Sequence, residues 1–154
     1  LLSLARQHGS PTLALNIKAD GLHDMLAEVL TAEGYDNYFL FDSSVPDLIQ
    51  GVKRGMTSFT RLSEYERVPS LYSEPGITGV WLDNFLPGRW YEAPLVEKLL
   101  DDGKLVALVA PDLHRRHDEY EPFLHWLVSS GLRDREGLMI CTDFPEKAKE
   151  LLRV

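Results

Sequence analysis

The chain has 154 residues, of which 44% are hydrophobic and 26% charged, and its net charge at pH 7 is −8. This length and composition predict one soluble globular domain over residues 1–154, with no apolar run long enough to cross a bilayer. The acidic charge argues against broad nucleic-acid binding, which depends on a basic face that neutralises phosphates. A single cysteine, Cys141, excludes an internal disulfide and favours a cytoplasmic protein.

Strand-like and helical segments alternate along the whole chain. Residues 1–7 carry apolar side chains on one helix face, as though a helix were already under way and the first part of the fold were missing. Strands are predicted at 13–18, 38–42, 57–61, 77–84, 105–110 and 137–142. Helices are predicted over 22–30, from Val45 to Gly51 or Gly55, and over 94–100, 121–128 and 145–152.

Six such βα units, with a repeat of roughly 20–30 residues, predict parallel strands with right-handed crossovers. Two α/β folds fit this pattern. One is an open doubly wound, flavodoxin-like sheet, and the other is a TIM (β/α)8 barrel without its first two units, since complete barrels need more than about 200 residues. Polar side chains follow nearly every strand, which favours a barrel mouth. They are Asn16, Lys18, Asp42, Arg61, Asp83, Asn84, Asp112, His114, Thr142 and Asp143.

The segment Leu-Asn-Ile-Lys at 15–18 resembles the third strand of glycerophosphodiester phosphodiesterases and of the wider PI-PLC-like phosphodiesterase superfamily. There an acidic residue helps to hold a divalent metal, and a lysine two positions later contacts the substrate phosphate. The ending Ile-Cys-Thr-Asp-Phe-Pro at 140–145 is similar to the family's last strand and turn, and the helix at 2–7 is similar to the one after its second strand. The resemblance implies a PI-PLC-like barrel that hydrolyses a small phosphodiester of lipid metabolism with Mg²⁺ or Ca²⁺.

The chain also departs from that family's pattern. The first two strands, with the catalytic histidines and acidic metal ligands, have no counterpart here, and the segment 110–114 replaces a tryptophan–threonine signature. Asn16 stands where the family has an acidic residue; its oxygen can ligate a hard cation but brings no charge. A competing hypothesis is therefore a catalytically inactive barrel that binds a phosphate or sugar phosphate and has lost its metal site.

Two residues of the 13–18 segment are the first candidates for the site. Lys18 is predicted to bind the substrate phosphate, because an anion offsets the cost of desolvating its amine. Asn16 is predicted to ligate the metal or to hydrogen-bond substrate, and its structural alternative is to bridge neighbouring strands. The other interpretation of Lys18 is that it merely ends the strand and reaches solvent.

Further candidates follow later strands. Asp83 is predicted to accept substrate hydroxyls or to join a metal site; alternatively it makes an Asx turn or caps the segment at 86–90. Arg61 either clamps a phosphate or pairs with Glu64. His114 is the acid–base candidate, as the histidine nearest to a strand end. Asp143 is expected to cap the last helix.

Overall fold

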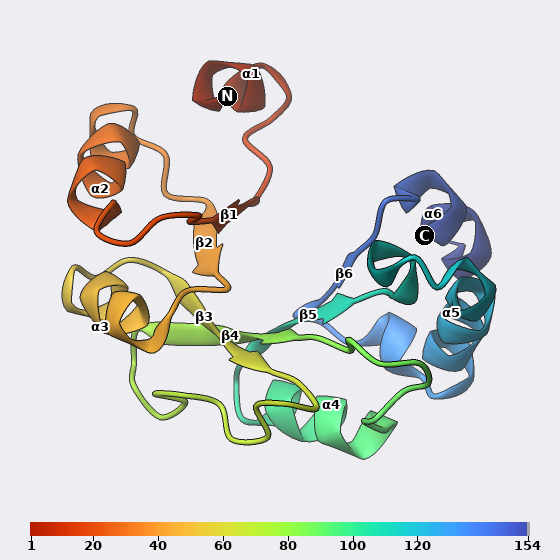
Figure 1. Ribbon diagram of the computed structural model, residues 1–154. Coiled ribbons are helices and arrows are strands. Elements are labelled where there is room, and N and C mark those ends of the chain that lie inside the picture. Colours follow the sequence, from red (N-terminus) through yellow and green to blue (C-terminus); the bar gives the residue numbers. More distant parts are fainter. Residues whose placement is uncertain (154) are drawn as a thin grey trace. The chain divides into compact units, whose positions relative to one another are not determined.

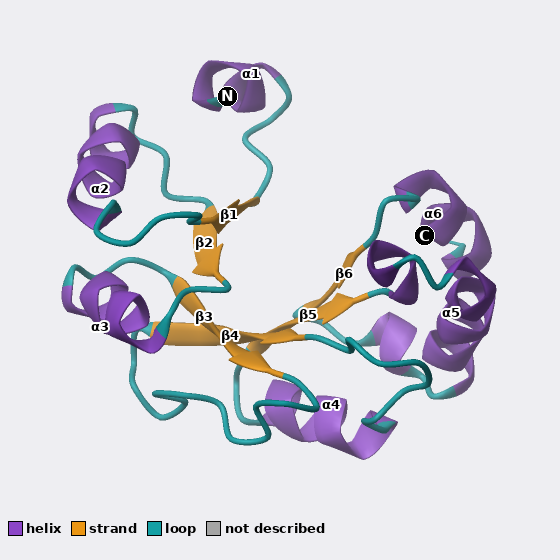
Figure 2. Cartoon of the chain, in the orientation of Figure 1, coloured by secondary structure: helices purple, strands orange, loops and turns teal. Residues whose placement is uncertain are grey.

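The computed structural model describes residues 1–153 and shows an α/β fold (Figure 1). Its six parallel strands are hydrogen-bonded neighbours in the order β1-β2-β3-β4-β5-β6 (Figure 2, orange). A doubly wound sheet reverses its strand order at a switch point, and this order has no reversal. The prediction of an α/β fold with parallel strands is confirmed, and the flavodoxin-like alternative is wrong. No helix within residues 1–153 has both the length and the apolar character needed to cross a membrane.

The chain divides into two compact units, which are described separately. The first unit is Leu1–Thr60 with Ser70–Thr78, and the second is Arg61–Pro69 with Gly79–Val154. Each unit has its own apolar core, and the prediction of one domain over 1–154 stays a prediction. The first unit contains α1 (Leu2–Gln7), β1 (Leu13–Asn16), α2 (His23–Ala32), β2 (Tyr38–Phe41), α3 (Val45–Lys53) and the beginnings of β3 (Ser58–Leu62) and β4 (Ile77–Leu82).

The strands of the first unit are shorter than the sequence predicts. β1 pairs with β2 in parallel from Leu13 opposite Tyr38 to Asn16 opposite Phe41, and both strands end there. Asp42, directly after β2, has a left-handed backbone with φ of +59°, which an extended strand does not allow. The ladder therefore stops two residues early, and Lys18 lies outside β1.

The helices of the first unit begin and end within two residues of the predicted bounds. Ser44 caps α3 by accepting a hydrogen bond from the Asp47 amide at 3.4 Å. Gly51 lies inside α3 rather than at its end, and a Cβ there would meet the Ser58 hydroxyl at 3.2 Å. Gly55, in the left-handed region with φ of +68°, follows the helix instead.

The second unit holds the rest of β3 and β4, followed by α4 (Ala93–Asp101), β5 (Leu105–Val109), η1 (Pro111–His114), η2 (His117–Glu119), α5 (Tyr120–Ser129), η3 (Leu132–Asp134), β6 (Leu138–Cys141) and α6 (Pro145–Leu152). β4 pairs with β5 and β5 with β6, both in parallel. Leu82, Val106 and Leu108 are fully buried, as are Leu124 and Leu127 of α5. Strands that are covered on both faces read as continuous apolar runs, which explains the Leu-Val-Ala-Leu-Val sequence of β5.

The start of the last helix differs from the prediction. Asp143 does not cap α6, whose N-cap position is Phe144 and which has no side-chain cap. Asp143 lies one residue before this N-cap, and its amide donates to the Asp112 carboxylate at 2.7 Å, so it belongs to the turn that leaves β6. Pro145 occupies the first helical turn, as predicted.

Candidate functional site

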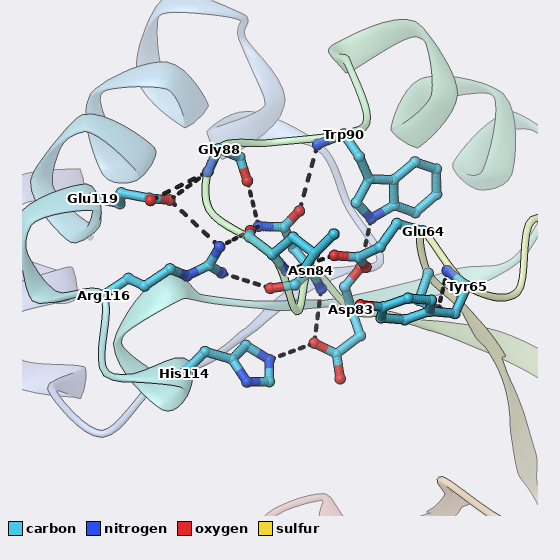
Figure 3. A network of polar contacts seen from close by, with 11 residues as sticks. Glu64, Tyr65, Asp83, Asn84, Gly88, Trp90, His114, Arg116 and Glu119 are labelled. Atoms are coloured by element: carbon cyan, nitrogen blue, oxygen red, sulfur yellow. Dashed lines mark hydrogen bonds and ion pairs between the residues drawn. The ribbon is translucent and has the colours of Figure 1, made fainter.

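Two of the predicted residues meet at the ends of β4 and β5. Asp83 directly follows β4, and its amide donates to the Leu62 carbonyl of β3 at 2.9 Å. His114 ends η1, the short helix that follows β5. The His114 Nε2 lies 2.7 Å from Asp83 Oδ1, an ion pair or hydrogen bond depending on protonation (Figure 3). The carboxyl ends of parallel strands are where α/β enzymes place their chemistry.

The environment of this pair defines its chemistry. Asp83 is only 7% exposed, and its Oδ1 also accepts the Asn84 amide at 2.7 Å. The His114 side chain is 24% exposed, so the ring can reach a bound molecule. When Asp83 is ionised, Nε2 must be the donor, and the neutral ring then presents Nδ1 as a proton acceptor. A carboxylate that fixes the tautomer and orientation of a histidine is an arrangement suited to acid–base catalysis.

Asp83 is held by a tightly bonded segment, residues 83–90, which we call the clamped loop. The Asn84 amide group lies inside it and donates to the carbonyls of Leu86 at 3.1 Å and Gly88 at 2.6 Å. Asn84 also accepts the Trp90 amide at 3.4 Å, and the Trp90 indole N–H donates to the Asp83 carbonyl at 2.8 Å. Asn84, rather than Asp83, therefore makes the structural turn that the sequence suggested for this segment.

Three charged side chains hold the clamped loop from outside (Figure 3). Arg116 donates to the carbonyls of Asn84, at 2.5 Å, and Leu86. Glu64 accepts the Leu86 amide at 2.6 Å, and Glu119 accepts the Gly88 amide at 3.2 Å. These contacts were not predicted, because they join segments that are 22 to 32 residues apart in the sequence.

The Glu64 contact also corrects the prediction for Arg61. Arg61 pairs with Glu66, while Glu64 accepts the Leu86 amide. The chain turns after β3, where Ser63 and Glu66 exchange backbone hydrogen bonds, and this turn returns Glu66 toward the strand. The predicted phosphate contact of Arg61 stays a prediction.

Two exposed aromatic rings lie beside His114, and the sequence reasoning missed both. The Phe85 ring centroid is 5.0 Å from that of His114, and the Tyr65 centroid is 5.9 Å from that of Phe85. Tyr65 is 68% exposed and Phe85 is 38% exposed. The signal that could have found Phe85 is an apolar residue directly after two polar ones at a strand end.

A second polar cluster joins the ends of β5 and β6. Asp112, 2% exposed, accepts the Thr142 hydroxyl at 2.8 Å through Oδ2, while its Oδ1 is buried with no hydrogen bond among residues 1–153. The Thr142 Oγ1 atom also lies 2.9 Å from the Tyr120 hydroxyl oxygen. Burial, followed by the negative charges of Asp112 and two other carboxylates, raises the pKa of the Cys141 thiol to about 11. These groups stabilise the strand ends.

A cavity of about 340 Å³ lies on another side of the clamped loop. Its lining includes Asn84, Tyr91, Glu119 and Phe123 rather than the His114 ring. Burial raises the pKa of the Tyr91 hydroxyl far above its usual range, so this phenol stays protonated. This cavity is therefore not lined by the His114–Asp83 pair, which lies beside the Phe85 ring.

The remaining predicted residues belong to the first unit. Asn16 is half-buried at the end of β1, and Lys18 is exposed without a hydrogen bond or ion pair to residues 1–153. His23 is buried as a packing residue, and its Nδ1 lies 3.5 Å from Asp47 Oδ1. A hydrogen bond between the Asp47 and Asp20 side chains raises the pKa of Asp20. Across residues 1–153, no three His, Cys, Asp or Glu side chains lie in a group that suits a metal ion. The roles of Asn16 and Lys18 stay predictions.

No family model matches the chain, and neither a curated protein nor a solved structure matches it. The phosphodiesterase resemblance therefore stays a prediction from short sequence motifs.

Proposed function

We propose that this chain is part of a hydrolase that cleaves a small phosphodiester, with His114 as acid–base residue and Asp83 as the carboxylate that orients it. The observation that carries the proposal is the 2.7 Å contact between His114 Nε2 and Asp83 Oδ1 at the carboxyl ends of two neighbouring parallel strands. A surface histidine with only a structural role does not need a partner such as Asp83, which is buried and held by a second hydrogen bond from the Asn84 amide.

The finer fold that we propose is a PI-PLC-like (β/α)8 barrel to which this chain contributes six strands. Its support is the strand order, since successive parallel strands that are always neighbours are the arrangement of a barrel wall. β1 and β6 end the order, so further strands of the intact protein would pair with them.

In the proposed reaction, water adds to phosphorus and the bond from phosphorus to the alcohol oxygen breaks. Protonated His114 gives its Nδ1 proton to the departing oxygen, while Asp83 stabilises the charged ring through Nε2. The proton that the attacking water loses restores the ring. The products are an alcohol and a phosphomonoester, and a positioned proton donor of this kind is worth about 10²–10⁴ in rate.

The metal and phosphate contacts are further parts of the proposal. Asn16 supplies one neutral oxygen, and the described residues add no acidic cluster around it, so they do not by themselves fit a site for Mg²⁺ or Ca²⁺. The steps above therefore use only the protein's own side chains. Lys18, which is exposed and free of ion pairs within residues 1–153, and Arg61 would contact the phosphate oxygens.

A second candidate function is a barrel that binds a phosphate or sugar phosphate without cleaving it. The neutral side chain at Asn16 favours this candidate, because the family's metal site depends on an acidic residue at that position. The two candidates differ in turnover and in their response to metal removal.

The experiment uses the full-length protein with glycerophosphocholine and measures released choline, with and without EDTA. We expect turnover that falls by about 10²-fold or more in His114→Gln and stays unchanged in His125→Gln, an exposed histidine of α5. Lys18→Ala should raise the KM. Turnover that survives His114→Gln would overturn the acid–base assignment, and metal-independent binding without turnover would establish the binding barrel.

A further inference from the structure

The structure shows an exposed pair of aromatic rings that the proposed reaction does not use. We call Tyr65 and Phe85 the aromatic shelf. Large exposed aromatic side chains that touch each other beside a polar pair are typical of binding surfaces. The shelf continues directly into the candidate site, because Phe85 contacts the His114 ring with centroids 5.0 Å apart.

Both rings of the shelf stand on rigid backbone. Phe85 lies inside the clamped loop, between Asn84 and Leu86, whose carbonyls are bound by Arg116. Tyr65 lies in the turn that follows β3, where the fully buried Ser63 hydroxyl accepts the Tyr65 amide at 3.2 Å. A surface that is already ordered loses little conformational entropy on binding, so such rings suit recognition.

A polar acceptor borders the shelf. Asp83 Oδ1 is bound to His114 and to the Asn84 amide, but Oδ2 makes no hydrogen bond within residues 1–153 and points away from the network in Figure 3. An alkyl chain on the shelf would remove Asp83 Oδ2 from solvent without offering it a hydrogen bond, which costs free energy. The occupant should therefore carry hydroxyl groups as well as an apolar face.

The angle between the rings distinguishes the remaining possibilities. The Tyr65 and Phe85 planes meet at 44°, and those of Phe85 and His114 at 53°. These tilts form a shallow corner rather than a parallel-sided slot for a flat nucleobase. A saturated six-membered sugar ring has C–H groups for the aromatic faces and hydroxyl groups at its edge.

We propose that the aromatic shelf binds the pyranose ring of a sugar and that Asp83 Oδ2 accepts a hydrogen bond from one of its hydroxyls. The inference rests on the proposed function, since it makes this sugar the alcohol part of the phosphodiester. It specifies the substrate as a sugar phosphodiester, with the ring on Phe85 and the scissile oxygen toward His114.

Binding is tested without turnover. The full-length protein is titrated with methyl glycosides of glucose, galactose and mannose, with glycerol as the acyclic polyol and uridine as the planar base, and binding is followed by ligand-observed NMR. We expect at least one glycoside to bind more tightly than glycerol or uridine. Phe85→Ala should weaken that binding by about tenfold, the loss of one aromatic contact, and Tyr65→Ala by less.

The controls separate a direct role from a folding defect. Phe85→Leu keeps the side chain apolar but removes the ring, and should weaken binding nearly as much as alanine while circular dichroism stays unchanged. Phe144→Ala removes another exposed aromatic of the same unit, one that contacts His117 and Tyr120, and should change nothing. Asp83→Asn keeps the shape but weakens the acceptor, and should lower glycoside affinity severalfold.

The outcomes for the shelf and for the reaction are distinguishable. No glycoside binding, or binding that Phe85→Ala leaves unchanged, overturns the shelf even if glycerophosphocholine is hydrolysed. Tighter binding of uridine than of every glycoside overturns the sugar assignment. Glycoside binding that depends on Phe85, without hydrolysis of any phosphodiester, keeps the shelf and overturns the proposed function.

Discussion

In the second unit, the polar side chains after β4 and β5 bind one another, whereas in the first unit Lys18 after β1 faces water alone. Asp83 has two short contacts and is almost wholly buried. Asp47, a buried carboxylate of the first unit, has longer contacts with the Gly21 amide and the Ser44 hydroxyl, both at 3.4 Å, and it also hydrogen-bonds Asp20. The candidate chemistry therefore lies where the strand ends are fixed by side chains.

This difference shows that a polar residue at a strand end is not enough to predict a site. Asn16 and Asp83 occupy similar positions in the sequence pattern, one directly at the end of a strand and one just after it. Within residues 1–153, neighbouring segments supply hydrogen-bond partners to the Asp83 side chain but not to that of Asn16. The predictions below test whether this contrast between the units has functional and energetic consequences.

The largest expected effect is on turnover. Asp83→Asn keeps the contact geometry but offers His114 an amide, which favours the wrong ring tautomer, so kcat should fall by about 10²–10⁴-fold. Asn16→Ala, in the first unit, should lower kcat less than Asp83→Asn does. The measurement is steady-state hydrolysis of glycerophosphocholine by the full-length protein. A greater loss in Asn16→Ala would move the centre of the chemistry to the first unit.

The next effect concerns the thiol at the end of β6. Because the pKa of Cys141 is raised to about 11, its thiolate is scarce at neutral pH. Alkylation by iodoacetamide at pH 8 should be about a hundredfold slower in the native protein than in guanidinium chloride.

The pH dependence gives this second prediction its sign. Burial and the nearby carboxylates favour the protonated thiol, so the native rate should keep rising with pH until about pH 11. Asp112→Asn removes one of these charges and should shift the curve to lower pH. A native rate that levels off near pH 9 would contradict the described environment.

A third comparison concerns the buried carboxylates of the two units. Asp112→Ala leaves the Thr142 hydroxyl and the Asp143 amide without their acceptor, and should lower the free energy of unfolding by about 2–3 kcal/mol. Asp47→Ala removes the longer contacts from the Gly21 amide and the Ser44 hydroxyl, and should cost less than Asp112→Ala. Urea unfolding followed by circular dichroism measures both. Equal losses would show that contact length does not separate the units energetically.

The smallest expected effect tests packing inside the first unit. A Cβ at Gly76 would lie 3.0 Å from Val52 Cγ1, closer than side chains pack, so Gly76→Ala should destabilise by about 1–2 kcal/mol. Adding Val52→Ala makes room for the new methyl, and the double variant should be less destabilised than the sum of the two single variants. The measurement is a double-mutant cycle of unfolding free energies, and strict additivity would contradict the contact.

The order of strands and helices could be predicted from the sequence because each depends on local periodicity and on nearby turn residues. Gly55 and Pro145 lie where those signals place them. The errors lie at strand ends. The sequence predicts that β1 reaches Lys18, but its ladder ends where β2 ends, at Phe41. β2 ends there because Asp42 has a positive φ, and the residues of β1 do not predict the conformation of Asp42.

The candidate site was predicted only in part. His114 and Asp83 were both singled out, but not as partners, since their contact depends on the register of β4 and β5 and on η1, which follows β5. Arg116 was not singled out because its role is to bind backbone carbonyls, which leave no trace in the residue pattern. Asp143 was assigned to the wrong role because the helix begins one residue later than expected, with Phe144 at the N-cap, and the Asp143 amide is bound by Asp112, a residue 31 positions away.

Arg115 has a left-handed backbone, with φ of +61°. It lies between His114, the proposed acid–base residue, and Arg116, which binds the carbonyls of the clamped loop. This single reversal fixes the spacing of its two neighbours, so any insertion or deletion there would misplace both at once. Orientation of the imidazole and anchorage of its carboxylate partner are thus mechanically coupled. Changes that retune the chemistry must preserve the length of this tripeptide, even where they alter its side chains.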